Sequence, residues 1–547
     1  MPSRQLTDLI PVGGGFDPEQ DPLQLTPDQS PRGENAVHNR STIYRRHSLY
    51  HTEAFLPTLG FLDSPIMGLG VWLDPAGTNY LMLHTDTGQT QLTDGVTDWR
   101  TVLAADEPNA QRYPVTNCNS LDHYFFAREN QPVCVYPSSP VALMAGYVKD
   151  ETGFAAASGV PVWGKYIASY AGRIFIGHTK EDPAGGTAYQ WYRQRVRWCQ
   201  DSDYTKWRSG TDAGAGGVDL ADTPGEVVGL YPFQGMLAVF KDDVIVMGQE
   251  TGDINFPMAW PTTIRAGCLS GRSIQPIGDG LLMFLGTDNF YVLDGATPRP
   301  VGSAVIRELL FQLNSASTRL AFSWCDYNDH TYHFAIPVRE GDAFDPDTTT
   351  VQIPARIYSY DWEENKWYVW TWPSGMTSAV WAQINAPSGS LNRALSLNRS
   401  YIGLACGLTG GGYDYGLFTL DDRDITEPED GTGPGTHPVA RASMYYETPD
   451  VRLNPEGHAQ LYCVYLHGEK LEFGDTVEAN FTVEVSVDRG QTWTPATLGS
   501  EATTELTKRS FYCNVFGETF RLRITLDRPG VTITGWRADF APRSPKR

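Results

Sequence analysis

The segment SIQPIGDGLLMFLGTDNFYVLDG (residues 273–295) decides the fold class, because two tight turns separate three short apolar runs within it. Residues 278–280 supply the first turn and residues 287–289 the second, while Asp294 and Gly295 close the segment. Glycine, aspartate and asparagine readily adopt the backbone conformations of tight hairpin turns. The segment therefore predicts three consecutive antiparallel strands.

Related segments recur from about residue 65 to residue 420, and their first turns follow one another at steps of 36 to 63 residues. A four-stranded sheet of about 40 to 50 residues cannot bury both faces alone, so several such sheets are expected to pack radially. We predict an all-β fold with a β-propeller of about seven blades; unrelated hairpins in two sandwiches are the alternative. The turns lie near Ala76, Leu121, Gly172, Gly235, Asp279, Asn328, Glu364 and Gly411.

The segments on either side of this repeat differ from it in composition. Residues 1–60 are proline-rich with little periodicity and predict an extended N-terminal arm, lying along the ring or on a neighbouring subunit. After the predicted propeller (61–420), an acidic Gly/Pro-rich linker is expected at 421–440. Residues 441–547 contain runs that alternate in period two, which is typical of an antiparallel β-sandwich. The one convincing helix candidate is short and covers residues 304–313.

Composition excludes several functional classes. The 64 Asp and Glu against 42 Lys and Arg leave a net charge of −22, which argues against binding nucleic acid or anionic lipid through charge. The eight cysteines show no Cys-x-x-Cys spacing, so we expect reduced core thiols and no zinc site. The longest clean apolar stretch, at 280–286, is far shorter than a membrane span, and no secretory signal pattern opens the chain.

SVDRGQTW (486–493) matches the Asp-box pattern S-x-D-x-G-x-T-W at Ser486, Asp488, Gly490, Thr492 and Trp493. The aspartate can accept backbone N–H bonds across a hairpin, the glycine can take a positive φ, and the tryptophan can bury its ring. Such turns recur in sialidase-like propellers, but a glycosidase also needs converging carboxylates that no spacing here nominates. We interpret the motif as a structural turn.

Two basic clusters are candidates for contacts between subunits. In WYRQRVRW (191–198), Arg193, Arg195 and Arg197 share one face if the segment is a strand. They either grip phosphates or a partner's carboxylates, or belong to a solvated edge strand with local pairs. Arg40, Arg45 and Arg46 form the other cluster, which would dock the arm on an acidic neighbour.

No motif for catalysis, metal binding or cofactor binding stands out. His330 and His333 would point to opposite faces of a strand, so shared metal ligation is not expected. The sequence has no His-Glu-x-x-His, no phosphate loop and no Gly-x-Ser-x-Gly. We therefore predict a non-enzymatic protein without catalytic residues, metal or cofactor.

Three regions resemble structural proteins of tailed-bacteriophage virions. The first is GGGFDPEQDPLQLTPDQSPRGENAVHN (13–39) followed by IYRRH (43–47). The second is LAVFKDDVIVMG (237–248) with RAGCLSGRSIQPIGDGLLMFLGTDNFYVLDG (265–295), and the third is ETPDVRLN (447–454) with VEVSVDRGQTW (483–493). The nearest members are the tail hub or nozzle β-propeller proteins of short-tailed phages. The acidic linker departs from their pattern and leaves the docking partner open.

The resemblance implies a homo-oligomeric ring, commonly sixfold, below the portal and adaptor of the tail. Its expected partners are these portal-proximal proteins and the tail fibres, with DNA passing through the lumen without specific binding. The expected location is the virion, and the host cytoplasm during assembly. Two alternatives remain: a receptor-binding propeller at the tail tip that recognises host-surface glycans, and a sialidase-like hydrolase.

Overall fold

The computed structural model describes most of the chain and is all-β, as the sequence predicts. Its only α-helix among the described residues, α1 (Ile306–Gln312), lies within the predicted helical stretch. The described residues also include three short 3-10 segments, η2 (Gly271–Ser273), η3 (Gly278–Gly280) and η4 (Ser315–Leu320). The described residues are 4–39, 41–45, 49–51, 62, 64–94, 99–105, 112–137, 144–150, 160–181, 189–338, 354–371, 375–384, 399–407, 413–420, 444–469, 481–499, 508–526 and 532–543.

The described part between residues 49 and 420 forms seven antiparallel four-stranded sheets and the short pair β15 (Lys149–Asp150) and β16 (Val160–Pro161). The first sheet contains β7 (Ile66–Leu73), β8 (Asn79–Thr85), β9 (Thr90–Thr93) and β10 (Arg100–Leu103), and the second contains β11 (Thr116–Ser120), β12 (His123–Arg128), β13 (Gln131–Tyr136) and β14 (Gly146–Tyr147). The third contains β17 (Gly164–Tyr170), β18 (Arg173–Glu181), β19 (Gln190–Trp198) and β20 (Gly216–Asp219). The fourth contains β21 (Val227–Phe233), β22 (Met236–Lys241), β23 (Ile245–Glu250) and β24 (Met258–Ile264). The other three are β25 (Gln275–Ile277), β26 (Leu281–Leu285), β27 (Phe290–Asp294) and β28 (Thr297–Pro300); β29 (Phe322–Asp326), β30 (Thr331–Pro337), β31 (Pro354–Asp361) and β32 (Lys366–Thr371); and β33 (Met376–Ala382), β34 (Arg399–Gly407) and β35 (Tyr413–Leu420) with β6 (Leu49–His51).

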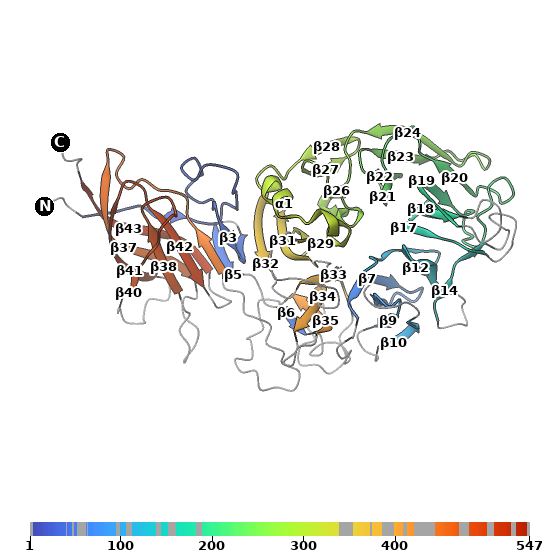
Figure 1. Ribbon diagram of the computed structural model, residues 1–547, viewed down its shortest axis with the longest axis horizontal. Helices are drawn as coiled ribbons and strands as arrows, with labels where there is room; N and C mark the ends of the chain where they lie inside the picture. Colours follow the sequence, from blue (N-terminus) through green and yellow to red (C-terminus); the bar gives the residue numbers. More distant parts are fainter. Residues whose placement is uncertain are drawn as a thin grey trace.

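The sheets follow one another around a curved body, which makes this part of the molecule propeller-like (Figure 1). The first strand of each sheet contacts the first strands of the next and the preceding sheet, with η2 standing beside β21 where β25 begins. The cycle runs from β7 through β11, β17, β21, β25, β29 and β33 back to β7. The first strands thus surround the centre of this part, and the later strands of each sheet lie further out.

Several hairpins at the start of the sheets use the turn geometry that suits twisted strands. In the β11–β12, β17–β18 and β21–β22 turns, both central residues have positive φ, as two-residue hairpin turns require. One expectation about the repeat is corrected: the turns near Asn328 and Glu364 belong to two hairpins of the same sheet, β29–β32. That is why their spacing of 36 residues was the shortest step.

The last of these sheets is completed by a strand from the start of the chain. β6 pairs antiparallel with β35, in the register Leu49↔Leu420 and His51↔Phe418. A strand before the first sheet and a strand near residue 420 thereby belong to one sheet, and the two ends of this region are held together by backbone hydrogen bonds. The pairing of β6 with β35 thus joins the first and last described segments of the propeller-like part.

The remaining strands form two further sheets at the other end of the long axis (Figure 1). One contains β4 (Ala36–Asn39), β5 (Thr42–Arg45), β43 (Thr532–Arg543), β37 (His458–Glu469), β41 (Lys508–Gly517) and β40 (Thr497–Leu498), with β1 (Gln5–Leu6) and β2 (Ile10–Pro11) paired to β43. The other contains β3 (Gly33–Glu34), β36 (Met444–Glu447), β42 (Arg521–Leu526), β38 (Phe481–Ser486) and β39 (Thr494–Pro495).

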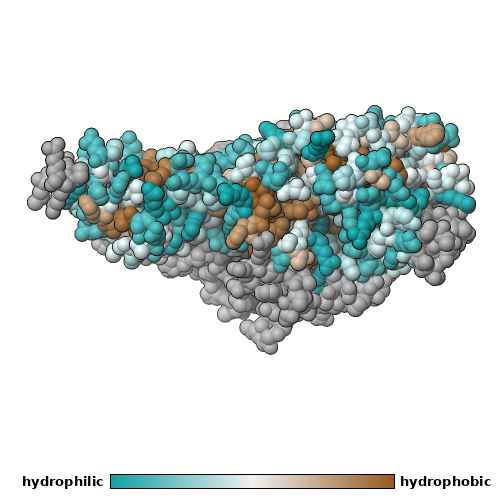
Figure 2. Space-filling view, turned by 45° about the horizontal axis from the view of Figure 1, so that its top comes forward, coloured by the Kyte–Doolittle hydropathy of each residue, from teal (hydrophilic) through white to brown (hydrophobic). Residues whose placement is uncertain are grey.

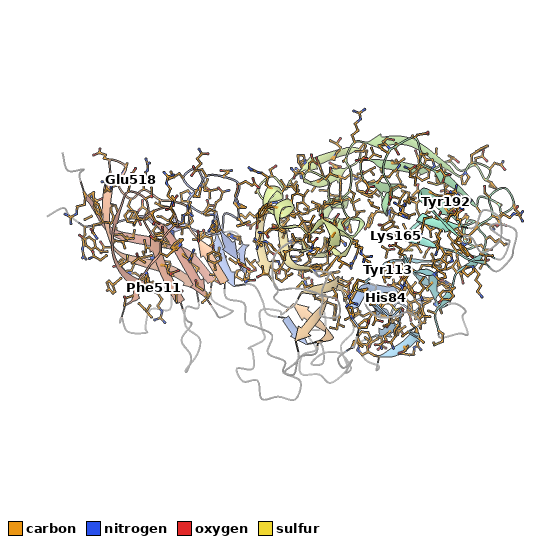
Figure 3. The ribbon with its side chains drawn as sticks, viewed as in Figure 1. His84, Tyr113, Lys165, Tyr192, Phe511 and Glu518 are labelled. Atoms are coloured by element: carbon orange, nitrogen blue, oxygen red, sulfur yellow. The ribbon has the colours of Figure 1, made fainter. Side chains whose placement is uncertain are left out.

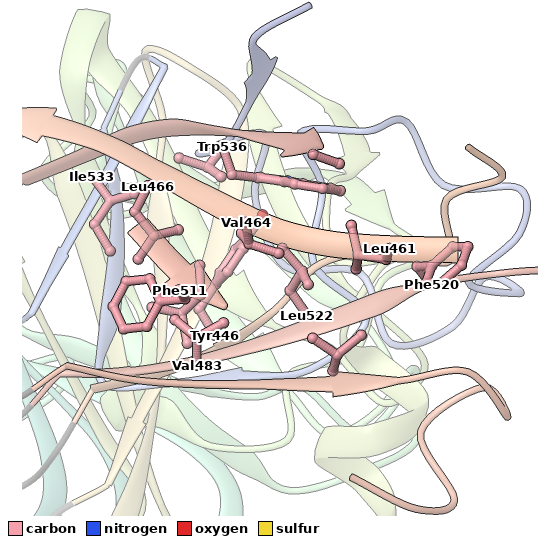
Figure 4. Close-up of a cluster of buried hydrophobic side chains, with 14 of the residues drawn as sticks. Tyr446, Leu461, Val464, Leu466, Val483, Phe511, Phe520, Leu522, Ile533 and Trp536 are labelled. Carbon is pink, nitrogen blue, oxygen red and sulfur yellow. The ribbon is translucent and has the colours of Figure 1, made fainter. Parts of the chain in front are cut away.

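A continuous hydrophobic core fills the space between these two sheets (Figure 4). Trp536 and Phe511 come from the first sheet and Tyr446 and Leu522 from the second, and all four are buried. Val12, Ala36 and Ile43 from the start of the chain belong to the same core. Apolar area removed from water holds the two sheets together.

The arm predicted at residues 1–60 lies, in its described part, mainly along the C-terminal sheets of its own chain. β1, β2 and β5 pair with β43, and β3 pairs with β36. The same segment also reaches the propeller-like part: the amide of Phe16 donates to the Trp367 carbonyl at 2.8 Å, and that of Asn35 to the Val369 carbonyl at 2.9 Å. Apolar residues of this segment are buried because they pack in the core between the two C-terminal sheets. The segment links the two parts of its own chain.

Candidate functional site

A cavity of about 390 Å³ lies in the middle of the propeller-like part. All seven first strands contribute to its wall, from Leu69 on β7 to Trp381 on β33. The first strands of the sheets contact one another in a cycle, so they surround a central space, and this space is the cavity. This axial cavity is the candidate binding site.

Glycines let the elements around the cavity approach closely. A Cβ on Gly271 would lie 1.6 Å from the Val228 carbonyl oxygen, so η2 can pack on β21 only with glycine at this position. Gly68 on β7 likewise allows a close approach to Val115, which directly precedes β11, because a Cβ at position 68 would lie 2.6 Å from the Val115 side chain. The narrow ring of first strands thus depends on residues without side chains.

Hydrogen bonds from side chains to neighbouring carbonyls tie the first strands to one another. Asn117 on β11 donates to the Leu69 carbonyl at 3.3 Å. Ser323 on β29 donates to the Arg272 carbonyl at 2.8 Å, and Gln275 donates to the Ser323 carbonyl at 3.0 Å. These bonds satisfy polar groups in the wall and hold the cavity in shape.

Arg272, on η2, is the charged residue of the cavity wall. Its guanidinium carbon lies 5.0 Å from the centre of the Phe322 ring. Burial lowers the pKa of Arg272 to about 10, because desolvation disfavours the charged form. Lys165, which directly precedes the wall residue Tyr166, forms an ion pair with Glu129 at 3.2 Å (Lys165 is labelled in Figure 3). No site residue was predicted here, because a lone arginine in a loop has no spacing that marks it.

The predicted basic strip lies on β19, where all three arginines are paired with carboxylates of the same chain. Arg195 contacts Asp219 at 2.6 Å and Glu181 at 2.8 Å, Arg197 also contacts Glu181 at 2.8 Å, and Arg193 contacts Glu226. Burial opposes ionisation of Glu181, yet hydrogen bonds from Arg197 and Thr179 leave its pKa lowered overall. These pairs neutralise the strip.

The interpretation of this segment as an edge strand is wrong, because β19 lies between β18 and β20. A contact between subunits through Arg193, Arg195 and Arg197 stays a prediction. Arg40 and Arg46 lie outside the described residues, and Arg45 is described only as the last residue of β5.

The Asp-box residues form a hydrogen-bonded turn between β38 and β39. Asp488 Oδ1 accepts from the amides of Gln491 at 3.1 Å and Thr492 at 2.8 Å, and Oδ2 accepts from the Thr492 hydroxyl. Ser486 Oγ accepts from the Gly490 amide at 2.8 Å. The bonds from Thr492 and Ser486 lower the pKa of Asp488 to about 2. The groups of the motif are thus occupied in shaping the turn.

Gly490 has φ +84°, a region that L side chains rarely adopt. We expect Gly490→Ala to lower the free energy of unfolding by about 1–2 kcal/mol, because alanine is strained at this backbone conformation. Chemical unfolding followed by tryptophan fluorescence measures the change. Gly33→Ala, at a position without positive φ where the new Cβ meets ordinary contacts, is the matched control. Equal effects of the two variants would contradict the strained turn.

Trp493 of the motif is half-buried, and its ring packs under the Arg523 guanidinium at 4.0 Å. Arg523 belongs to a network of ion pairs that sequence reasoning missed. It contacts Glu447 at 2.9 Å, and Arg521 contacts Asp450 at 2.9 Å and Glu447 at 3.4 Å. The members lie 71 to 76 positions apart in the chain, so no local spacing indicates them. The network joins β36 to β42.

His330 and His333 of the β29–β32 sheet do not face a common site. His330 lies in a turn with its Nδ1 3.3 Å from Glu363, whereas His333 is buried, with Nδ1 2.7 Å from Ser359 Oγ. Across the described ranges, no three His, Cys, Asp or Glu side chains group as metal ligands would. The seven cysteines whose side chains are described form no disulfide bond with one another. Within the same ranges, no helix has the length and apolar character of a membrane span.

The fold and the cavity define an all-β, propeller-like class of protein. No protein-family model and no curated protein sequence matches the chain. Among solved structures, the chain is similar to Raptor of Chaetomium thermophilum, with 10% identity, a TM-score of 0.37, and coverage of 69% of this chain and 30% of Raptor. It is also similar to the Pan2 WD40 domain of Neurospora crassa, with 9% identity, a TM-score of 0.36, and coverage of 66% and 90%. The chain thus spans less than a third of Raptor.

Proposed function

We propose that this chain is a non-enzymatic structural protein of a bacteriophage tail, assembled as a ring below the portal and adaptor. In this role it extends the tail channel and retains or conducts DNA during ejection. The resemblance of residues 13–47, 237–295 and 447–493 to hub and nozzle proteins supports the class. Within it, the chain would be a seven-bladed propeller joined to a β-sandwich, which the cycle of first strands and the core between the C-terminal sheets support.

One observation carries the ring assembly: each part of the elongated body has its own exposed apolar group. In the propeller-like part, Ile254 and Phe256 of the β23–β24 loop are 64% and 74% exposed. In the C-terminal part, Leu498, Tyr512 and Phe516 on β40 and β41 are 46% to 52% exposed. The face in Figure 2 is mostly hydrophilic, with a hydrophobic group near its middle and smaller ones elsewhere. Such groups on a polar surface are typical of contact sites.

Two different surfaces that bind each other make a heterologous contact between copies. A heterologous contact generates a closed ring when the rotation between copies closes, and an open filament when it does not. The ties of residues 16 and 35 to β32 hold the two parts of each copy together, as a repeating rigid unit requires. A ring function fits such a unit.

The net charge of the chain suits a channel for DNA. Each copy carries −22, so six copies would carry −132. Acidic groups that face a lumen repel DNA phosphates and let the genome slide rather than adhere. The mechanism is therefore geometric and electrostatic and needs no reactive group.

Mass photometry of the purified chain tests the ring. We expect a closed oligomer, and we expect Ile254→Asp with Phe256→Asp to return it to monomers, because two charges would be buried in the contact. Leu73→Asp, at an apolar residue that is 53% exposed outside both groups, is the matched control and should leave the ring intact. Disassembly by the control as well, or a wild-type monomer, would count against the assembly.

The place of the ring is tested separately by electron microscopy of virions that carry a label at the C-terminus of the chain. A label in the tail below the portal supports the proposal, whereas a label on the capsid shell or on peripheral fibres overturns it. Binding of the isolated protein to host cells would instead support the receptor-binding alternative, and release of a fluorophore from a sialoside would support a hydrolase.

A further inference from the structure

The axial cavity carries a single formal charge in a chain that is strongly acidic. Among the described residues that form its wall, Arg272 alone is charged, whereas the chain as a whole carries −22. Arg272 is half-buried, and none of the described wall residues is a carboxylate that could pair with it. A partly desolvated cation without a counter-charge is costly. The arrangement is the one expected of a site that receives its negative charge from a ligand.

The hydrogen-bonding groups of the wall point to the same ligand chemistry. Nη1 of Arg272 is buried and has no hydrogen-bond partner among the described residues. The indole nitrogens of Trp324 and Trp381, two further wall residues, are also buried donors without a partner there. All three are donors, and buried polar groups in native proteins are almost always paired. Three residues of the wall thus carry buried donors that lack an acceptor among the described residues.

Aromatic rings make up much of the rest of the wall. Tyr327 packs edge-on against Trp381 with ring centres 5.0 Å apart, and Tyr327 donates to the Pro276 carbonyl at 2.8 Å, so its hydroxyl is already used. Phe322 lies beside the guanidinium. Tyr166, Tyr231 and Trp324 complete the aromatic set. Such rings pack against planar or apolar bodies.

We propose that the axial cavity binds a small organic monoanion, whose carboxylate accepts hydrogen bonds from Arg272 and whose planar body packs against the aromatic wall. Its 390 Å³ falls in the range of small-molecule sites. A guanidinium matches a carboxylate in geometry and in charge. A phosphate dianion fits less well, since a second cation for its second charge is missing from the wall residues. This site is independent of the ring proposed above.

Isothermal titration calorimetry of the full chain tests the site with benzoate as the probe. We expect a dissociation constant of about 1 mM or tighter. The neutral isostere benzamide and inorganic phosphate should each bind at least about tenfold more weakly, because a charge-assisted bond or the aromatic packing is lost. Equal binding of benzamide, or tighter binding of inorganic phosphate, would overturn the proposed ligand class.

Variants place the binding in the cavity. Arg272→Gln should weaken benzoate binding at least about tenfold, and Arg272→Lys should retain part of it. Arg307→Gln removes one positive charge from a side chain that is 84% exposed and should leave binding unchanged. Ala379→Phe fills the cavity from β33 without touching the charge, so it should abolish binding even if the Arg272 variants prove unstable.

Retained binding in Ala379→Phe, with the fold verified by thermal unfolding, would show that benzoate binds elsewhere and would overturn the proposal. Absence of benzoate binding to the wild-type chain would do the same. Loss of ring assembly in the tests above has no bearing on these results, because the cavity lies within one copy.

Discussion

Lowering the pH from 7 to 5 is expected to reduce the free energy of unfolding by about 6 kcal/mol, because three buried histidines stay neutral in the folded chain. Burial lowers the pKa of His38, His84 and His333 to about 3 each, with a contribution from Lys366 at His38 and from Arg128 at His84. The unfolded chain protonates these rings near pH 6.5. The unfolded state then binds more protons, so the contribution to stability is complete above pH 6.5 and is lost as the pH falls towards 3.

Each histidine contributes about 2 kcal/mol of this loss at pH 5, since one pKa unit corresponds to about 1.4 kcal/mol. The surroundings explain why the rings stay neutral. His333 stacks on Trp324 at 4.7 Å between ring centres, and His84 lies between Thr90 Oγ1 at 3.0 Å and the Tyr124 hydroxyl at 2.9 Å. At His84 and His333, a charged imidazolium would lose water without gaining an acidic partner, and at His38 burial outweighs the opposing effect of Asp28 on the pKa.

Urea unfolding at pH 7, 6 and 5 measures the effect. His333→Gln should reduce the pH dependence by about one third while costing some stability at pH 7, because the amide keeps a polar group beside Ser359 but does not titrate. His330→Gln is the matched control three positions away, since the His330 side chain is 45% exposed in a turn. An unchanged slope in His333→Gln, or an equal change in both variants, would contradict the assignment.

Asp86→Ala is expected to reduce the free energy of unfolding by about 3–5 kcal/mol, because it leaves a buried arginine without its counter-charge. Arg112 contacts Asp86 at 2.7 Å, with side-chain exposures of 1% and 0%. The Arg112 amide also donates to the same carboxylate at 2.6 Å. The nearby Arg128 donates to the Asp86 carbonyl at 3.1 Å, so the site holds two guanidinium groups.

Chemical unfolding of Asp86→Ala, compared with the wild type, measures this loss. The matched control is Arg452→Ala, which breaks the Arg452–Glu518 pair of similar length (3.2 Å) at side-chain exposures of 51% and 53% (Glu518 is labelled in Figure 3). That variant should cost less than about 1 kcal/mol, since water and salt screen an exposed pair. Replacing both buried partners, as Asp86→Leu with Arg112→Met, should recover much of the loss. Similar costs for the buried and the exposed pair would refute the argument.

Local features of the fold follow directly from the sequence. The segment 273–295 forms β25, β26 and β27 with turns at the predicted residues, and α1 lies inside the predicted helical stretch. Both depend on residues within a few positions of each other, where turn chemistry and hydrophobic periodicity act. The Asp-box turn is of the same kind, since Ser486 and Thr492 are close enough in sequence to bind Asp488 directly.

Features that join distant segments escaped this reasoning. The pairing of β6 with β35 spans some 370 positions, and the core shared by Ile43 and Trp536 spans nearly 500. The sequence predicted an arm for the proline-rich start of the chain because this segment alone contains no second sheet on which its strands could pack. Local pairs were one of the two readings for Arg195 and Arg197, but the sequence did not identify Glu181 as the shared partner, because it lies on the neighbouring strand β18.

By itself, the sequence determined that this chain is a series of short antiparallel hairpins, because glycine, aspartate and apolar alternation act over a few residues. Only the tertiary structure decided that β6 completes the sheet of β33, β34 and β35, that β1 to β5 pair within the C-terminal sheets, and that Arg272 lines a shared cavity. The physical reason is that any free strand edge accepts another strand through backbone hydrogen bonds, so the choice of partner depends on which apolar faces the whole fold buries together.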